Sequence, residues 1–178
     1  KFISDISIIE KLLAPNQWVT LGIKPTKPSE AYGYIRINKD DKSIPKKVVK
    51  FIEKPSKKIA SKFIKSGNYF WNAGIFISKA KNVLQSIKKY DPEIASHCDK
   101  NFYNITINEK TNEIKFSQDL YSKIPSRSID YAVMEKEQNI FLYPFNGEWS
   151  DIGSWDSFSN TCIEKRKSNN IIQVDSHS

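Results

Sequence analysis

Short β-branched runs alternate along this chain with segments whose apolar residues recur at helical spacing. No other feature constrains the fold as strongly. The predicted strands are residues 18–23, 32–37, 46–55, 69–78 and 139–145, and the predicted helices are residues 4–14, 56–67, 80–90, 126–138 and 154–165. Such alternation predicts an α/β fold with a largely parallel sheet.

Three local patterns refine this prediction. The small residues Asn72, Ala73 and Gly74 predict a turn at the entry to the strand at 69–78. Ser128 predicts a cap for the helix at 126–138. The polar, Asn-rich residues 101–118 predict either a loop or a weak hairpin.

Composition excludes several classes of protein. A chain of 178 residues with 39% hydrophobic and 12% aromatic content can bury a globular core. No apolar run approaches the roughly 18 residues that a membrane-spanning helix needs. Cys98 and Cys162 match no metal or redox spacing. We therefore expect a reduced, cytoplasmic protein with no membrane partner.

The net charge of +8 raises the question of nucleic-acid binding. The lysines are dispersed over several short segments, a distribution typical of solvated helix and loop surfaces. An anionic small substrate, such as a phosphate ester, explains the charge better than a dedicated nucleic-acid surface.

Glu53 and Lys54 end a predicted strand, at the edge where α/β sheets bind their ligands. The carboxylate can accept hydrogen bonds from sugar hydroxyls, and the ammonium can neutralise a phosphate. Adjacent strand residues point to opposite faces, although the turn forced by Pro55 relaxes that constraint. A solvated Glu–Lys pair at a strand end is the competing interpretation.

Three further residues have both a functional and a structural interpretation. Asn72 either binds hydroxyls or bonds its own turn, and Gly33 marks either a ligand's close approach or an irregular strand. Asp151, between Trp149 and Trp155, is either a metal ligand or the cap of the helix that follows. The aromatic pair would then fix its loop.

In order, the chain contains the motifs YGYI, FIEKP, YFWNAGIFIS, SIDYAVMEK and WSDIGSW. This combination resembles the sugar-phosphate nucleotidylyltransferases, and within them the mannose-1-phosphate guanylyltransferases. The resemblance implies a partial nucleotidyltransferase-type (Rossmann-like) fold, with a mixed, mainly parallel sheet flanked by helices. It also implies transfer from GTP to mannose 1-phosphate, giving GDP-mannose and pyrophosphate.

The resemblance assigns roles to individual residues. Gly33 would meet the sugar through its backbone, Glu53 and Asn72 would hold sugar hydroxyls, and Lys54 would bind the sugar phosphate. Asp151 would be the second of two aspartates that bind the essential Mg²⁺. Lys54 and Asp151 would thus be the catalytic residues.

The sequence also departs from the family pattern. It contains no glycine-rich loop of the type G-G-x-G-x-R-L, which binds the nucleotide triphosphate, and no first metal-binding aspartate. Glu30 and Ala31 stand where many members have Thr-Gly.

These departures predict a part of a larger enzyme that is inactive alone. We expect a sugar-phosphate-binding part at residues 1–165, the start of a further region at 166–178, a separately encoded N-terminal half and self-association. A non-catalytic sugar-phosphate-binding or interaction module is the alternative.

Overall fold

The computed structural model describes residues 1–153, 155 and 158. The chain divides into two compact units, Lys1–Asn146 and Gly147–Ser178. Most of the helix predicted at 154–165, and the predicted boundary after residue 165, lie outside the described residues. Both stay predictions.

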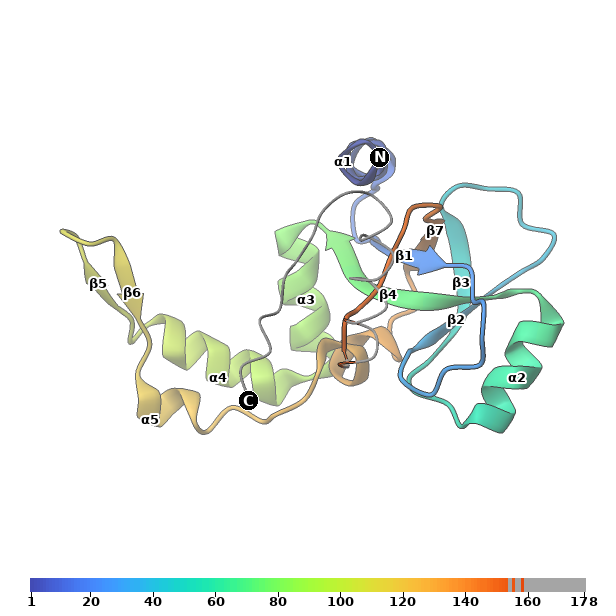
Figure 1. Cartoon of the computed structure of the whole chain (residues 1–178). Helices are drawn as coiled ribbons and strands as arrows, with labels where there is room; N and C mark the ends of the chain where they lie inside the picture. The colour runs from blue at the N-terminus through green and yellow to red at the C-terminus, as the bar shows by residue number, and fades with distance from the viewer. Residues whose placement is uncertain (154, 156–157, 159–178) are drawn as a thin grey trace, which may run out of the picture. The chain divides into compact units, whose positions relative to one another are not determined.

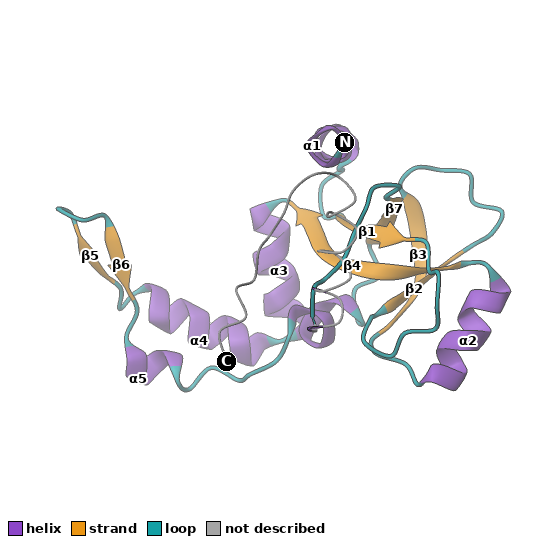
Figure 2. Cartoon of the chain, viewed as in Figure 1, coloured by secondary structure: helices purple, strands orange, loops and turns teal. Residues whose placement is uncertain are grey.

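Helices and strands alternate in the first unit, as the sequence predicts (Figures 1 and 2). The helices are α1 (Phe2–Leu12), α2 (Lys57–Ser66), α3 (Ala80–Tyr90), α4 (Pro92–Phe102), α5 (Gln118–Tyr121) and the π-helix η1 (Asp130–Met134). The strands are β1 (Trp18–Ile23), β2 (Tyr34–Ile37), β3 (Lys46–Ile52), β4 (Tyr69–Ser78), β5 (Thr106–Asn108), β6 (Glu113–Lys115) and β7 (Ile140–Pro144).

Five strands close into a barrel in the order β1-β4-β2-β3-β7. Among the described strand pairs, only β1 with β7 is parallel, whereas β1–β4, β4–β2, β2–β3 and β3–β7 are antiparallel. The mixed character of the sheet is confirmed, but the prediction of a mainly parallel sheet is wrong.

The position of β2 explains this error. The crossover through α2 does give β3 and β4 the same direction, as the alternation of elements predicts. However, β2 returns directly into β3 and lies between β3 and β4, antiparallel to both. One inserted strand therefore replaces a parallel pair with two antiparallel pairs.

The segment Asn72-Ala73-Gly74 lies inside β4, so the predicted turn at the strand entry is wrong. The pairing of β1 with β4 shifts register between Thr20 and Gly22, and β4 carries the extra residues of this bulge. Gly74 has φ of 70°, a conformation that costs glycine little. The small residues thus mark a bulge and not a chain reversal.

The helix predicted at 126–138 contracts to the five residues of η1. The backbone carbonyl of Ser128 accepts a hydrogen bond from the Ala132 N–H, but no side chain caps η1. The prediction that Ser128 caps this helix is therefore also wrong. Ala132, Val133 and Met134 are all buried. Three consecutive inward residues fit poorly on one face of a regular α-helix, so packing overrides the local helical pattern.

The core of the first unit joins the barrel to η1 and α3. Val133, Ile140 and Leu142 are fully buried within it, and Ile9 of α1 is buried as well. The residues of the β5–β6 hairpin are all exposed, which confirms the weak hairpin among the two predicted alternatives. Hairpin formation therefore adds little to the core.

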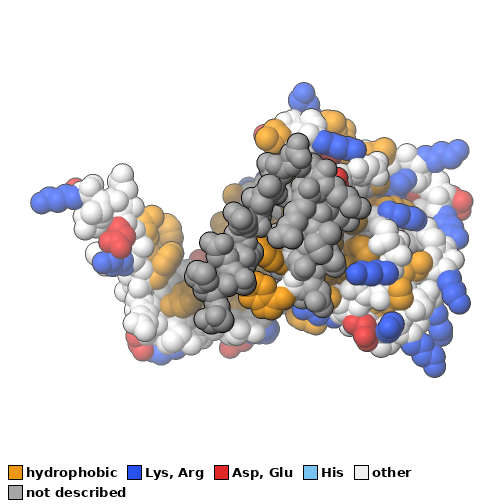
Figure 3. All heavy atoms as spheres, in the orientation of Figure 1, with side chains coloured by type: hydrophobic (Ala, Val, Ile, Leu, Met, Phe, Trp, Pro, Cys, Tyr) orange, Lys and Arg blue, Asp and Glu red, His pale blue; other side chains and the backbone are white. Residues whose placement is uncertain are grey.

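Cationic side chains are distributed over the exposed surface of the barrel and α2 in the view of Figure 3, with acidic side chains among them. Among the described residues, no helix has the length and apolar character needed to cross a bilayer.

We predict that Leu142→Ala lowers the free energy of unfolding by about 2–5 kcal/mol, because it opens a cavity at a fully buried position. Leu84→Ala is the matched control, since Leu84 of α3 is exposed, and we expect a change within about 0.5 kcal/mol. Urea unfolding followed by circular dichroism measures both. Equal losses in the two variants would contradict the placement of this core.

Candidate functional site

The register of three strands brings Gly33, Glu53 and Asn72 together. Tyr34 of β2 pairs with Ile52 of β3 on one side and with Trp71 of β4 on the other. Gly33 precedes Tyr34 in the chain, whereas Glu53 follows Ile52 and Asn72 follows Trp71. The backbone N–H of Asn72 donates to the carbonyl oxygen of Gly33 at 2.8 Å. Three of the predicted sugar-binding residues therefore meet at one end of the sheet.

The missing side chain of Gly33 makes room for Glu53. A Cβ atom at Gly33 would lie 2.5 Å from Glu53 Oε2 and 3.4 Å from Asn72 Cβ. A side chain at position 33 would therefore have to displace the Glu53 carboxylate from its present place. The chain's own carboxylate makes the close approach at Gly33 in this structure, so the approach of a ligand stays a prediction.

Glu53 and Lys54 face each other despite being neighbours in the chain. Lys54 has φ of 45°, in the left-handed region that costs a non-glycine residue about 1–2 kcal/mol. This turn brings Lys54 Nζ within 3.7 Å of Glu53 Oε1. The Glu53 side chain is only 10% exposed and that of Lys54 is 59% exposed, so the ammonium is the accessible partner. The competing interpretation, a solvated Glu–Lys pair, therefore holds for Lys54 but not for Glu53.

Burial raises the pKa of Glu53 above its ordinary value of 4.5, and the nearby Asp130 carboxylate raises it further. Lys54 opposes this shift, while Glu135 adds to it. Glu135 Oε1 also accepts a hydrogen bond from the Glu53 backbone N–H at 3.3 Å. Glu53 thus lies in an acidic environment in which Lys54 is the cation that lowers its pKa.

Sequence reasoning missed two polar neighbours of Asn72. Thr20 Oγ1 donates to Asn72 Oδ1 at 2.9 Å, and Asn72 Nδ2 donates to Asp130 Oδ1 at 3.2 Å. The available signal for Thr20 was a polar residue inside an otherwise apolar strand. The Asn72 side chain thus bonds to two other elements, β1 and η1.

Glu30 has a structural role at the position where the sequence departs from the family pattern. Glu30 Oε1 accepts a hydrogen bond from the backbone N–H of Lys57 at 2.9 Å. Lys57 begins α2, so the carboxylate satisfies one of the free donors at that helix N-terminus.

Asp151 lies in the second unit, in a turn of its own. Its Oδ1 accepts a hydrogen bond from the Gly153 N–H at 3.3 Å, and Ser150 Oγ accepts from the Ile152 N–H at 3.3 Å. Trp155 is 85% exposed, and its ring meets that of Phe158 edge-on with 6.1 Å between the centroids. The predicted role of Trp149 and Trp155 in fixing this loop stays a prediction. Whether Asp151 caps the next helix cannot be read from the described residues.

The described residues include no cluster of three or more carboxylate, histidine or cysteine side chains able to hold a metal. An exposed carboxylate such as Asp151 still fits Mg²⁺, which proteins often bind through one or two carboxylates together with substrate phosphates and water. Asp151 can therefore supply one ligand and not a complete protein site.

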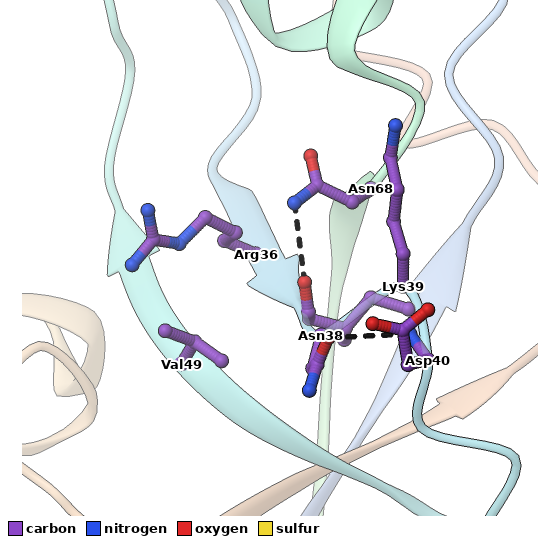
Figure 4. Close-up of a pocket in the computed structure, with 7 residues that line it drawn as sticks. Arg36, Asn38, Lys39, Asp40, Val49 and Asn68 are labelled. Carbon is purple, nitrogen blue, oxygen red and sulfur yellow. Dashed lines mark hydrogen bonds between the residues drawn. The ribbon is translucent and has the colours of Figure 1, made fainter.

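A separate hollow lies toward the other end of β2 (Figure 4). Its lining residues are Arg36, Ile37, Asn38, Lys39, Asp40, Val49 and Asn68. Asn68 Nδ2 donates to the Ile37 carbonyl at 3.3 Å, and the Asp40 N–H donates to Asn38 Oδ1 at 3.2 Å. Both hydrogen bonds join residues that line the hollow. None of the predicted site residues lines it.

The fold and the site define an α/β protein with a carboxylate, a carboxamide and an exposed ammonium at one end of its sheet. The chain belongs to the nucleotidyl transferase family, whose model matches residues 7–167. The resemblance inferred from the motifs is thereby confirmed.

Several curated relatives are similar to this chain in sequence. A mannose-1-phosphate guanylyltransferase of Escherichia coli (strain K12) is 36% identical over 78% of this chain and 30% of its own length. The RfbM mannose-1-phosphate guanylyltransferase of Salmonella typhimurium is 37% identical over 88% of this chain and 32% of its own length. The xanthan biosynthesis protein XanB of Xanthomonas campestris is 32% identical over 98% of this chain and 37% of its own length.

The solved structures agree on the fold. One described as mannose-6-phosphate isomerase from Helicobacter pylori has a TM-score of 0.76 and 29% identity, over 84% of this chain and 58% of its own. Another, described as mannose-1-phosphate geranyltransferase from Thermus thermophilus, has a TM-score of 0.73 and 25% identity, over 89% of this chain and 45% of its own. This chain thus spans between 30% and 58% of the length of these relatives.

We predict that the free energy of unfolding of the native protein falls as pH rises because Glu53 loses its proton. In Glu53→Gln this part of the fall should be absent. Since the folded-state pKa of Glu53 is raised, the folded state holds more protons than the unfolded state between the two pKa values. The stabilisation that comes from protonated Glu53 is fully present below the ordinary pKa of 4.5 and is lost as pH rises through the folded-state pKa.

Urea unfolding of both proteins at a series of pH values from about 4 upward measures the difference. Glu109→Gln, in the exposed turn of the β5–β6 hairpin, is the control. Parallel stability curves for the native protein and Glu53→Gln would contradict the prediction.

Proposed function

We propose that this chain forms the sugar-phosphate-binding part of a mannose-1-phosphate guanylyltransferase, which converts GTP and mannose 1-phosphate into GDP-mannose and pyrophosphate. Family membership and the names of the E. coli and Salmonella relatives support the reaction class. The observation that carries the proposal is the meeting of Gly33, Glu53 and Asn72 beside the exposed ammonium of Lys54.

The chemistry of these groups suits a phosphorylated sugar. A carboxylate accepts hydrogen bonds from hydroxyls, and an amide offers both donors and acceptors. Glu53 and Asn72 therefore bind sugar hydroxyls, while the Gly33 backbone allows close contact with the ring. Lys54 contributes the positive charge for the sugar phosphate.

In the proposed reaction, a phosphate oxygen of mannose 1-phosphate forms a bond to the α-phosphorus of GTP. The bond from that phosphorus to the bridging oxygen breaks, and pyrophosphate leaves with the electron pair. Such a transfer depends on positioning and on electrostatic stabilisation more than on covalent help from the protein. Lys54 both orients the attacking phosphate and offsets its charge.

Asp151 is proposed as one carboxylate ligand of Mg²⁺. When bound, Mg²⁺ would neutralise charge on the transferring phosphoryl group. The chain's own contribution is the single carboxylate, held by the turn around Gly153.

We predict that Lys54→Met weakens the binding of mannose 1-phosphate by about tenfold or more, because a hydrogen bond to a charged partner is lost. Lys50→Met is the matched control, since Lys50 is likewise an exposed lysine but lies within β3 and outside the site. Isothermal titration calorimetry measures both variants, with mannose as a second ligand. The proposed role of Lys54 fails if both variants lose affinity equally, or if mannose binding falls as much as that of its phosphate.

We further predict that Asp151→Asn abolishes Mg²⁺-dependent pyrophosphate release by the full-length protein from GTP and mannose 1-phosphate. The amide is isosteric but cannot supply the negative charge that the cation requires. A coupled pyrophosphate assay at increasing Mg²⁺ measures this loss, with Asp119→Asn on exposed α5 as the control. Unchanged Mg²⁺ dependence would remove Asp151 from the proposed metal site.

A further inference from the structure

Three residues from separate elements form a chain of hydrogen bonds beneath the proposed sugar site. Thr20 of β1 contacts Asn72 of β4 at 2.9 Å, and Asn72 contacts Asp130 of η1 at 3.2 Å. Thr20 is 0% exposed and Asn72 is 8% exposed. The bulge between β1 and β4 sets the register at which Thr20 meets Asn72.

The carboxylate of Asp130 fixes the direction of this chain. An ionised carboxylate only accepts hydrogen bonds, so the Asn72 amide must present its nitrogen to Asp130. The amide oxygen then faces Thr20, whose hydroxyl must donate. A neutral amide at position 130 could donate or accept equally well, and the direction would be lost.

We propose that Asp130 and Thr20 are positioning residues that lock the Asn72 carboxamide in one orientation and so set the donor that it offers to a sugar hydroxyl. The inference rests on the proposed function of this site. Asn72 Nδ2 carries two N–H groups, and Asp130 accepts one of them. Within the described part of the chain, no protein acceptor is recorded for the other, which is left to bind a ligand hydroxyl.

The same carboxylate acts on the second sugar-binding side chain. Asp130 raises the pKa of Glu53, after burial the largest contribution, with Glu135 acting in the same direction and Lys54 in the opposite one. Asp130 thus faces both predicted hydroxyl-binding side chains, Asn72 by a hydrogen bond and Glu53 through its charge. Removing that charge should affect the two in different, separately measurable ways.

The test uses Asp130→Asn, Thr20→Val and Thr20→Ser in the full chain. Thr20→Val keeps the side-chain shape but removes the donor, so the Asn72 amide gains freedom to rotate. We expect the affinity for mannose 1-phosphate to fall by about tenfold in Thr20→Val and in Asp130→Asn, the effect of one hydrogen bond. Thr20→Ser keeps the hydroxyl and should restore binding to within about twofold. Thr106→Val, on the exposed hairpin strand β5, is the control.

NMR supplies a readout that needs no ligand. The side-chain amide resonances of Asn72 should shift in Thr20→Val and return in Thr20→Ser. The titration of the Glu53 carboxyl carbon should move to lower pH in Asp130→Asn, because a neighbouring negative charge is gone. A merely structural role of Asp130 or Thr20 predicts neither the rescue by serine nor this directed change.

The two proposals fail in different ways. Absence of mannose 1-phosphate binding by the native chain would overturn the proposed function, while the amide and carboxyl resonances would still decide the positioning roles. Unchanged Asn72 resonances in Thr20→Val, or equal affinities for Thr20→Val and Thr20→Ser, would overturn the positioning inference. If Thr20→Val does not fold, Asp130→Asn decides it through the same resonances and titration.

Discussion

The placement of β2 between β3 and β4 is the constraint on which the site depends. Gly33, Glu53 and Asn72 lie far apart in the sequence and become neighbours only because Tyr34 pairs with both flanking strands. A slip of one residue on either side would turn the alternate face of a strand toward the site. The same pairing aligns the buried rows of the barrel, so the core and the site share one register.

The charged side chains at this end of the sheet are mostly acidic. Glu53, Asp130 and Glu135 gather around a single nearby cation, Lys54, whose ammonium is mostly in solvent. Burial of Glu53 is the main cause of its raised pKa, and the neighbouring negative charge of Asp130 adds to it. Carboxylates with a pKa shifted in this way are common at binding and catalytic sites, which agrees with the proposed sugar site.

The sequence predicts the elements of this fold better than their directions. Apolar runs and helical spacing located the strands β1, β4 and β7 and the helices α2 and α3, because these patterns are local. Strand direction depends on which strands become neighbours, and nothing local reports that β2 separates β3 from β4. The contraction of residues 126–138 to η1 has a similar cause, since the burial of Ala132, Val133 and Met134 depends on the barrel beneath them.

The site shows the same division. Gly33, Glu53 and Asn72 were predicted from residue types and motif order, and the structure brings them together. Their supporting residues were not, because Thr20 and Asp130 act through contacts between elements. The role of Asp151 as a metal ligand stays a prediction, since the structure describes only the turn around it.

The backbone at Lys54 shows how position and chemistry are connected. An extended residue at this point would send the Glu53 and Lys54 side chains to opposite faces of β3. The left-handed conformation costs about 1–2 kcal/mol, yet it places ammonium and carboxylate on the same side. A glycine would adopt that conformation at less cost but would carry no charge. The chain therefore retains a strained lysine where a relaxed residue would serve the fold alone, which argues that the charge itself is what position 54 supplies.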